Sequence, residues 1–189
     1  IGASTPYEDG DYFAWGEIKA KSSYTESNYK YWGSKYNSTD GKTSLTASDD
    51  AATAKWGAGC RIPSTAELKE LKSKCSWSWK SNYNGTSGYL VTGPNGNSIF
   101  LPAAGMCEDE KLEFHGTEGN YWSCQPYSED KYYAHLLSFG RNDMDILGSD
   151  RYLGFSIRPV ANKSNNDSSN DDSSQDGQDD DTSPDGHEH

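Results

Sequence analysis

The chain has 189 residues and a formal net charge of −12, with 29 acidic against 17 basic side chains. This length is enough for one domain with a sizeable core. The net acidity and the lack of a stripe of Lys and Arg argue against nucleic acid as a partner, because phosphate binding needs clustered positive charge. No apolar run approaches the roughly 18 residues of a membrane-spanning helix, so no membrane-spanning segment is expected.

The aromatic residues separate a domain from a tail. All of the 6 Trp, 13 Tyr and 5 Phe precede Val160, whereas residues 161–189 are mainly Asn, Ser, Asp, Gly and Gln and include eight Asp. Such a segment cannot bury enough apolar surface to offset its ordering entropy. We therefore predict a domain over residues 1–160 built around aromatic side chains, and a disordered acidic tail over residues 161–189. A solvated linker is favoured over a functional acidic arm.

The first part of the domain is predicted to hold a strand, a loop and a helix. The aromatic run 11–15 is typical of a short strand, and the polar, aromatic segment 22–42 indicates a long surface loop pinned by Tyr and Trp. A helix is expected over residues 48–56, where Ser48 can serve as the N-cap and Gly57 as the stop.

A second helix carries stronger local signals. Ser64 and Glu67 have the spacing of a capping box, in which each side chain accepts a hydrogen bond from the other residue's backbone. Leu68, Leu71 and Cys75 then recur at helical spacing. This pattern predicts a helix with one apolar face turned to the core.

Strands dominate after Cys75. Trp77 and Trp79 alternate with serines, which places both rings on one face of a strand. The segments 89–92 and 98–101 flank the turn 93–96 and predict a hairpin. Further short strands are expected at residues 119–124, 132–139 and 155–160. Helices followed by a run of short strands and long loops predict the α+β class.

The four cysteines do not define a disulfide framework. Cys60, Cys75, Cys107 and Cys124 allow three full pairings, and the sequence does not choose among them. A helix between Cys60 and Cys75 would separate them by roughly 16 Å, which is beyond disulfide reach. Free buried thiols are therefore at least as well supported as bridges.

Residues 135–160 combine a regular end with an irregular middle. The end, from Gly154 to Val160, alternates like a half-buried strand, but the middle follows no period. Leu136, Leu147 and Leu153 stand where polar residues would be expected. This irregularity needs an explanation, because the flanking segments are well patterned.

Several motifs resemble one known family. The segments GCRIPSTAELKEL, GYLVTGPNGNSIFLPAAG, GNYWSC and RYLGFSIRPV occur in this order. Together they resemble the Fibrobacter succinogenes major paralogous domain, a C-type-lectin-like module of secreted and surface proteins in gut bacteria. The opening IGASTPYEDGDYFAWGE matches as well, so the resemblance spans residues 1–160. It implies a C-type-lectin-like fold with two helices, short mostly antiparallel strands and long loops, and a further strand before Ile1. Cys60 and Cys124 replace the family's usual Trp and Ser.

The resemblance also accounts for the irregular stretch. In related phage and bacterial modules, a diversity-generating retroelement rewrites selected codons near the C-terminal end. Such segments keep a fixed frame around variable positions. The period of a strand agrees with this division, since Leu137 and Phe139 would then face the core while Leu136 and Ser138 face outward. The resemblance implies one exposed ligand-binding surface made of Gln125, Tyr127, Leu136, Ser138, Asp143, Asp145, Leu147, Ser149, Asp150 and Leu153.

Metal and catalytic chemistry find little support. The run from Asp143 to Gly148 lacks the ligand pattern of a calcium loop. Gln125-Pro126-Tyr127 lacks the third ligand of a lectin calcium triplet, and neither His115 nor His135 has a partner at metal spacing. No paired-carboxylate or Ser-His-Asp motif stands out. No cofactor, metal or enzymatic activity is therefore expected.

The expected function is ligand binding outside the cell. A secreted or surface-displayed adhesin of this kind would present the variable surface to a protein or glycan on another cell. The alternative, from a different class, is a structural or spacer domain of a modular surface protein, in which the acidic tail serves as the linker.

Overall fold

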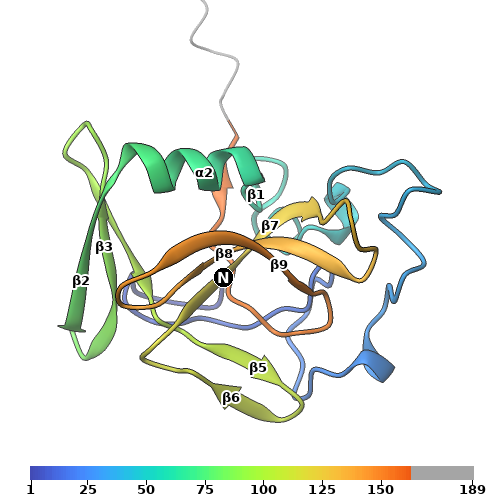
Figure 1. Ribbon diagram of the computed structural model, residues 1–189, viewed down its shortest axis with the longest axis horizontal. Coiled ribbons are helices and arrows are strands. Elements are labelled where there is room, and N and C mark those ends of the chain that lie inside the picture. The colour runs from blue at the N-terminus through green and yellow to red at the C-terminus, as the bar shows by residue number, and fades with distance from the viewer. Residues whose placement is uncertain (163–189) are drawn as a thin grey trace, which may run out of the picture.

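The computed structural model describes residues 1–162 and places two short α-helices around four small antiparallel sheets (Figure 1). The helices are α1 (Ala51–Trp56) and α2 (Thr65–Lys74), with 3₁₀ turns η1 (Glu26–Asn28) and η2 (Ala47–Asp49) before them. The predicted α+β class is confirmed. The predicted acidic tail, beyond its first two residues, lies outside the described part of the chain.

The strands pair in four groups. The central sheet has the order β7 (Gly119–Pro126), β8 (Tyr133–Phe139) and β9 (Met144–Asp150). A second three-stranded sheet consists of β2 (Ser76–Tyr83), β3 (Thr86–Thr92) and β4 (Ser98–Pro102). Two-stranded ribbons are formed by β5 (Met106–Glu108) with β6 (Lys111–Glu113), and by β1 (Cys60–Arg61) with β10 (Val160–Ala161).

Helix α1 starts later than its sequence predicts. Its N-cap is Asp50, whose side chain accepts hydrogen bonds from the backbone N–H groups of Ala52 and Thr53. Ser48, the expected cap, lies instead in η2. The predicted stop is confirmed, because Gly57 follows the helix with a φ of 80°, a conformation that favours glycine.

Helix α2 agrees closely with its prediction. Ser64 and Glu67 form the capping box. Leu68 is buried, and Leu71 and Cys75 pack against the same cluster of core residues. All four cysteines of the chain are free thiols.

The central sheet separates two apolar cores. On one face, Tyr121 of β7 and Leu137 of β8 pack with Leu68 of α2. On the other face, Trp122 and Leu136 pack with a cluster that includes Trp15, Phe155 and Ile157. Since both faces are covered, buried residues follow one another along β7, and Leu136 and Leu137 of β8 are both buried although they point to opposite faces.

The predicted alternation along β8 is therefore half wrong. Leu137 and Phe139 are buried as expected, but Leu136 is only 2% exposed because Trp122 lies directly across from it on the same covered face. Trp122 and Phe155 are core residues as well. At Gly119, directly opposite Phe139, a Cβ atom would lie 2.1 Å from the ring, so glycine allows the close approach of the two strands.

Two expected strands are reduced, and four strands were not predicted: β1, β5, β6 and β9. The aromatic run 11–15 contributes one bridge, between Phe13 and Phe155, and most of the 155–160 segment pairs irregularly. The irregular middle of the 135–160 stretch is in fact the regular strand β9. Ala161, assigned to the tail by composition, pairs with Cys60 in the β1–β10 ribbon. The β structure thus extends past the predicted domain boundary.

Candidate functional site

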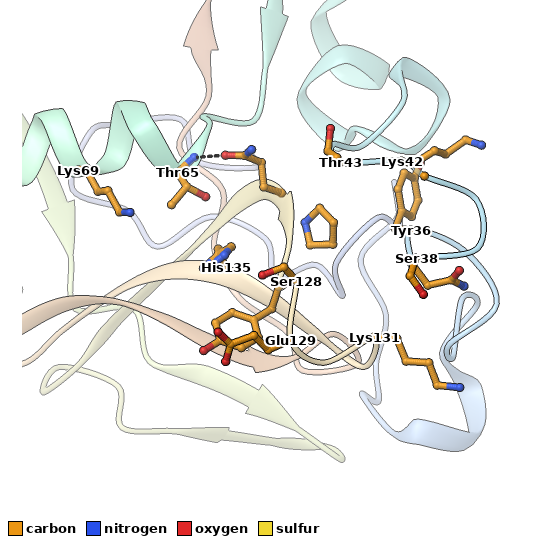
Figure 2. Close-up of a pocket in the computed structure, with 15 residues that line it drawn as sticks. Tyr36, Ser38, Lys42, Thr43, Thr65, Lys69, Ser128, Glu129, Lys131 and His135 are labelled. Atoms are coloured by element: carbon orange, nitrogen blue, oxygen red, sulfur yellow. Dashed lines mark hydrogen bonds between the residues drawn. The ribbon is translucent and has the colours of Figure 1, made fainter.

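A cleft of about 750 Å³ opens beside the central sheet, and we take it as the candidate site (Figure 2). Its walls come from three separate segments: the loop 36–43, the first turns of α2, and the segment 125–131 that connects β7 to β8. His135 of β8 borders it as well. The volume lies within the range of small-molecule sites in proteins.

A buried carboxylate holds the loop 36–43 in place. Asp49 accepts hydrogen bonds of 2.5 Å from the hydroxyl groups of both Tyr31 and Tyr36, and Lys35 forms an ion pair with it. Burial alone would raise the pKa of the Asp49 carboxyl, but the hydrogen bonds from these three side chains outweigh burial and hold its pKa below the ordinary value. The carboxylate is therefore charged and fixes one wall of the cleft.

A buried arginine connects the same loop to the central sheet. Arg151 has no measurable exposure and follows β9 directly. Its guanidinium donates to the backbone carbonyls of Lys35 at 3.0 Å and Tyr36 at 2.9 Å, and its Nε donates to that of Tyr133 at 2.8 Å. The guanidinium also lies 4.7 Å from the centre of the Trp15 ring. These contacts bring the loop, which is distant in sequence, against β8.

Gln125 joins the second and third walls. Its Oε1 accepts a 2.9 Å hydrogen bond from the backbone N–H of Thr65, the first residue of α2. Because Thr65 is the first residue of α2, its N–H has no acceptor within the helix, and the Gln125 side chain supplies that acceptor. The Thr65 and Ser123 hydroxyl groups are 3.0 Å apart and share a further hydrogen bond. Gln125 therefore has a positioning role in the cleft wall.

Tyr127 lies over β8 and β9. Its ring centre is 4.9 Å from that of His135, and Gly148 lies directly across from His135 in the sheet. A Cβ atom on Gly148 would come within 2.8 Å of the Tyr127 ring, which is too close for a relaxed contact. Gly148 therefore allows the ring to pack flat against the sheet.

His135 is an unsatisfied polar group next to the cleft. Its Nδ1 is buried and has no hydrogen-bond partner in the described part of the chain. Burial lowers the pKa of the imidazole below its ordinary value, and the nearby Lys69 lowers it further, against a smaller opposing effect of the Leu147 backbone. The ring is therefore neutral at pH 7.

The cleft has an excess of positive charge. Lys42, Lys69 and Lys131 line it, against Glu129 as the single carboxylate. None of the three lysines forms an ion pair with any residue in the range 1–162. An unpaired lysine on a cleft wall is free to interact with an anionic group.

The residues of the predicted ligand-binding surface are dispersed. Gln125 and Tyr127 line the cleft, whereas Leu136 and Leu153 are core residues, 2% and 6% exposed. Their predicted exposure is wrong, because the cluster around Trp122 covers the face of the sheet on which Leu136 lies and also encloses Leu153. Ser138 is half-buried and donates a hydrogen bond of 2.9 Å to Asn120.

The predicted residues on β9 and before it are more open. Asp143, Asp145 and Leu147 are exposed, with Leu147 at 47%, while Ser149 and Asp150 are half-buried. Leu147 lies directly opposite Leu136 and shares its face, whereas Tyr127 packs on the other face over Gly148. The ten residues therefore do not form one surface.

Other lining residues of the cleft were not predicted. The loop 36–43, Lys69 and His135 come from parts of the sequence that carry no binding motif. The one local signal is at Lys69, which has no acidic residue three or four positions away on its helix and is therefore available for another partner. The contacts that gather these segments are too long-range to be read from sequence patterns.

Metal binding and membrane insertion find no support in the residues 1–162. No three His, Cys, Asp or Glu side chains of this range come together as a metal site requires. None of its helices is long and apolar enough to cross a bilayer.

Comparisons with protein-family models, curated proteins and solved structures give no match to the chain. The C-type-lectin-like fold and the diversified segment therefore stay predictions from the sequence.

Proposed function

We propose that residues 1–162 form a non-enzymatic ligand-binding module with a C-type-lectin-like fold, displayed by a secreted or cell-surface protein of bacterial or phage origin. The observation that carries this proposal is the cleft itself. Its three walls are each fixed by buried polar contacts, through Asp49, Arg151 and Gln125. A recess whose walls are held so rigidly can bind a ligand without a large ordering cost.

The sequence resemblance supports a site in this region. Gln125 and Tyr127 belong to the positions that the resemblance marks as ligand-binding, and both line the cleft. The exposed Leu147 would form a separate contact on the opposite face of the sheet, whereas Asp145 forms an ion pair with Lys72 of α2. The ligand is a glycan or protein of another cell or surface, and the cleft is the part that holds it.

The proposal is tested by capture of the full chain on an array of immobilised oligosaccharides and extracellular proteins. Tyr127→Ala should abolish capture of the chain by the probe that binds the unchanged protein, while Leu112→Ala should leave that capture unaffected. Leu112 is a suitable control because it is apolar, 48% exposed and located on β6, outside the cleft. Thermal unfolding of both variants shows whether the fold is intact.

A second pair of variants tests the position of the Tyr127 ring without removing the ring. Gly148→Ala keeps Tyr127 but displaces it, whereas Gly59→Ala adds a Cβ atom with no neighbour within 4 Å. We expect weaker capture for Gly148→Ala alone. Capture that is insensitive to both Tyr127→Ala and Gly148→Ala would show that the cleft is not the site. No capture on the whole array would favour the spacer function.

A further inference from the structure

We propose that the ligand of the cleft is an acidic saccharide, with its carboxylate or sulfate group beside Lys69 and a sugar ring near Tyr127. This inference rests on the proposed function and specifies its ligand. The charge, the shape and the polar groups of the cleft all favour such a ligand.

The charge of the cleft is opposite to that of the protein. The chain carries a net charge of −12, yet three lysines and one glutamate line the cleft. Figure 2 shows Lys69 extending from α2 towards His135, with Lys42 and Lys131 on the far side of the cleft. Because Lys69 has no carboxylate partner in residues 1–162, an anion bound beside it would replace water without breaking an existing ion pair.

The other lining groups suit a sugar. Ser38, Thr43 and Ser128 line the cleft, and none of their hydroxyl groups forms a hydrogen bond with another side chain in residues 1–162. Tyr127 adds a half-exposed aromatic ring. Hydroxyl groups that both donate and accept match the hydroxyls of a saccharide. The apolar face of a sugar ring can pack on a tyrosine.

The lining residues argue against a phosphate ester and a large protein face. A phosphate monoester carries about two negative charges at pH 7, whereas a carboxylate or a sulfate ester carries one, which is the charge that Lys69 alone can neutralise. A recess of about 750 Å³ accommodates a short oligosaccharide, whereas a typical protein interface is a broad surface of about 800 Å² on each partner. A single carboxylate or sulfate is the anion that one lysine can hold.

His135 provides an internal reporter of the bound charge. Burial lowers its pKa, and Lys69 lowers the pKa further by repelling the protonated ring. An anion beside Lys69 would offset that repulsion and raise the pKa of His135. A neutral sugar in the same place has no charge with which to do so.

The experiment is calorimetric titration of the full chain with three matched trisaccharides, whose terminal residue is glucose, glucuronic acid or glucose 6-sulfate. We expect the acidic probes to bind at least about tenfold more tightly than the neutral one. Lys69→Gln should remove that preference. Lys74→Gln is the matched control, because Lys74 lies on the same helix, is exposed and does not line the cleft.

Proton NMR of the histidine rings gives a second readout. The acidic probe that binds should raise the pKa of His135, and so should Lys69→Gln in the free protein. Comparison of the glucuronic acid and sulfate arms identifies which anionic group the cleft accepts.

Three outcomes would overturn the inference. Equal binding of neutral and acidic probes, unaffected by Lys69→Gln but lost in Tyr127→Ala, would refute the acidic ligand and leave the proposed function intact. Tighter binding of an aspartate-rich hexapeptide than of any saccharide would make the ligand a peptide. If none of the probes binds, although the array captures the chain through the cleft, the ligand is not a saccharide of this kind.

Discussion

The burial of Leu136 and the exposure of Leu147 give a direct test of the sheet. The two residues lie opposite each other on β8 and β9, yet Leu136 is 2% exposed and Leu147 is 47% exposed. Truncating a fully buried leucine to alanine costs about 2–5 kcal/mol. We therefore expect Leu136→Ala to lower the free energy of unfolding by about 3 kcal/mol, and Leu147→Ala by less than about 1 kcal/mol.

Thermal and urea unfolding can separate these two values. For a chain of this size, each kcal/mol lowers the melting temperature by roughly 2–4 °C, so Leu136→Ala should lower it by roughly 6–12 °C. The conservative exchange Leu136→Met should recover most of that loss, because it nearly conserves the volume. Equal effects of Leu136→Ala and Leu147→Ala, or a neutral Leu136→Ala, would show that the core does not extend beneath this face of β8.

Three further predictions concern the ionisable side chains of Arg151, Glu67 and Cys107. Arg151→Met should lower the free energy of unfolding by about 3 kcal/mol in guanidinium titration, because it leaves buried loop carbonyls without a donor. The ion pair with Arg61 lowers the pKa of Glu67 to about 2, so the stability from this carboxylate should be complete above its ordinary pKa and lost as the pH falls towards 2. Glu67→Gln should remove that acid-dependent part of the stability profile. Burial raises the pKa of Cys107 to about 11, so alkylation at pH 8 should be far slower in the folded chain than in urea.

Local signals in the sequence predicted the helices well. The capping box of Ser64 and Glu67 and the glycine stop at Gly57 act within one or two turns of a helix, so the neighbouring residues suffice to identify them. The hairpin of β3 and β4 was predicted for the same reason, since its turn lies between two apolar runs. For the first helix, the predicted N-cap Ser48 lies in a 3₁₀ turn, and the N-cap is Asp50, two residues later.

Strand β9 could not be recognised because its two faces have different surroundings. Met144 and Ile146 pack against the core on one face, as alternation predicts. Leu147 lies on the other face and is exposed, although Leu136, its neighbour on that face, is covered by the core. A rule based on polarity alone therefore cannot assign the surroundings of Leu136 and Leu147. A strand at the edge of a sheet whose two faces are unequally covered has no simple hydrophobic period.

The sequence predicted two residues of the cleft but not the cleft itself. Gln125 and Tyr127 were identified because the resemblance marks them, but the loop 36–43 reaches the cleft through contacts that span more than a hundred residues. Arg151 makes those contacts. The sequence identifies it only as part of the motif RYLGFSIRPV and not as a partner of the loop. No property of the loop's own residues indicates which strand it will pack against.

The structure also limits which positions of the predicted variable set could vary. Asp143, Asp145 and Leu147 are exposed, so most side chains would be tolerated there at little cost. Leu136 and Leu153 support the core, and a polar residue at either position would be buried without a partner. A diversified segment on this frame would therefore change the exposed positions of β9 freely, while Leu136 and Leu153 remain fixed in the core around Trp122.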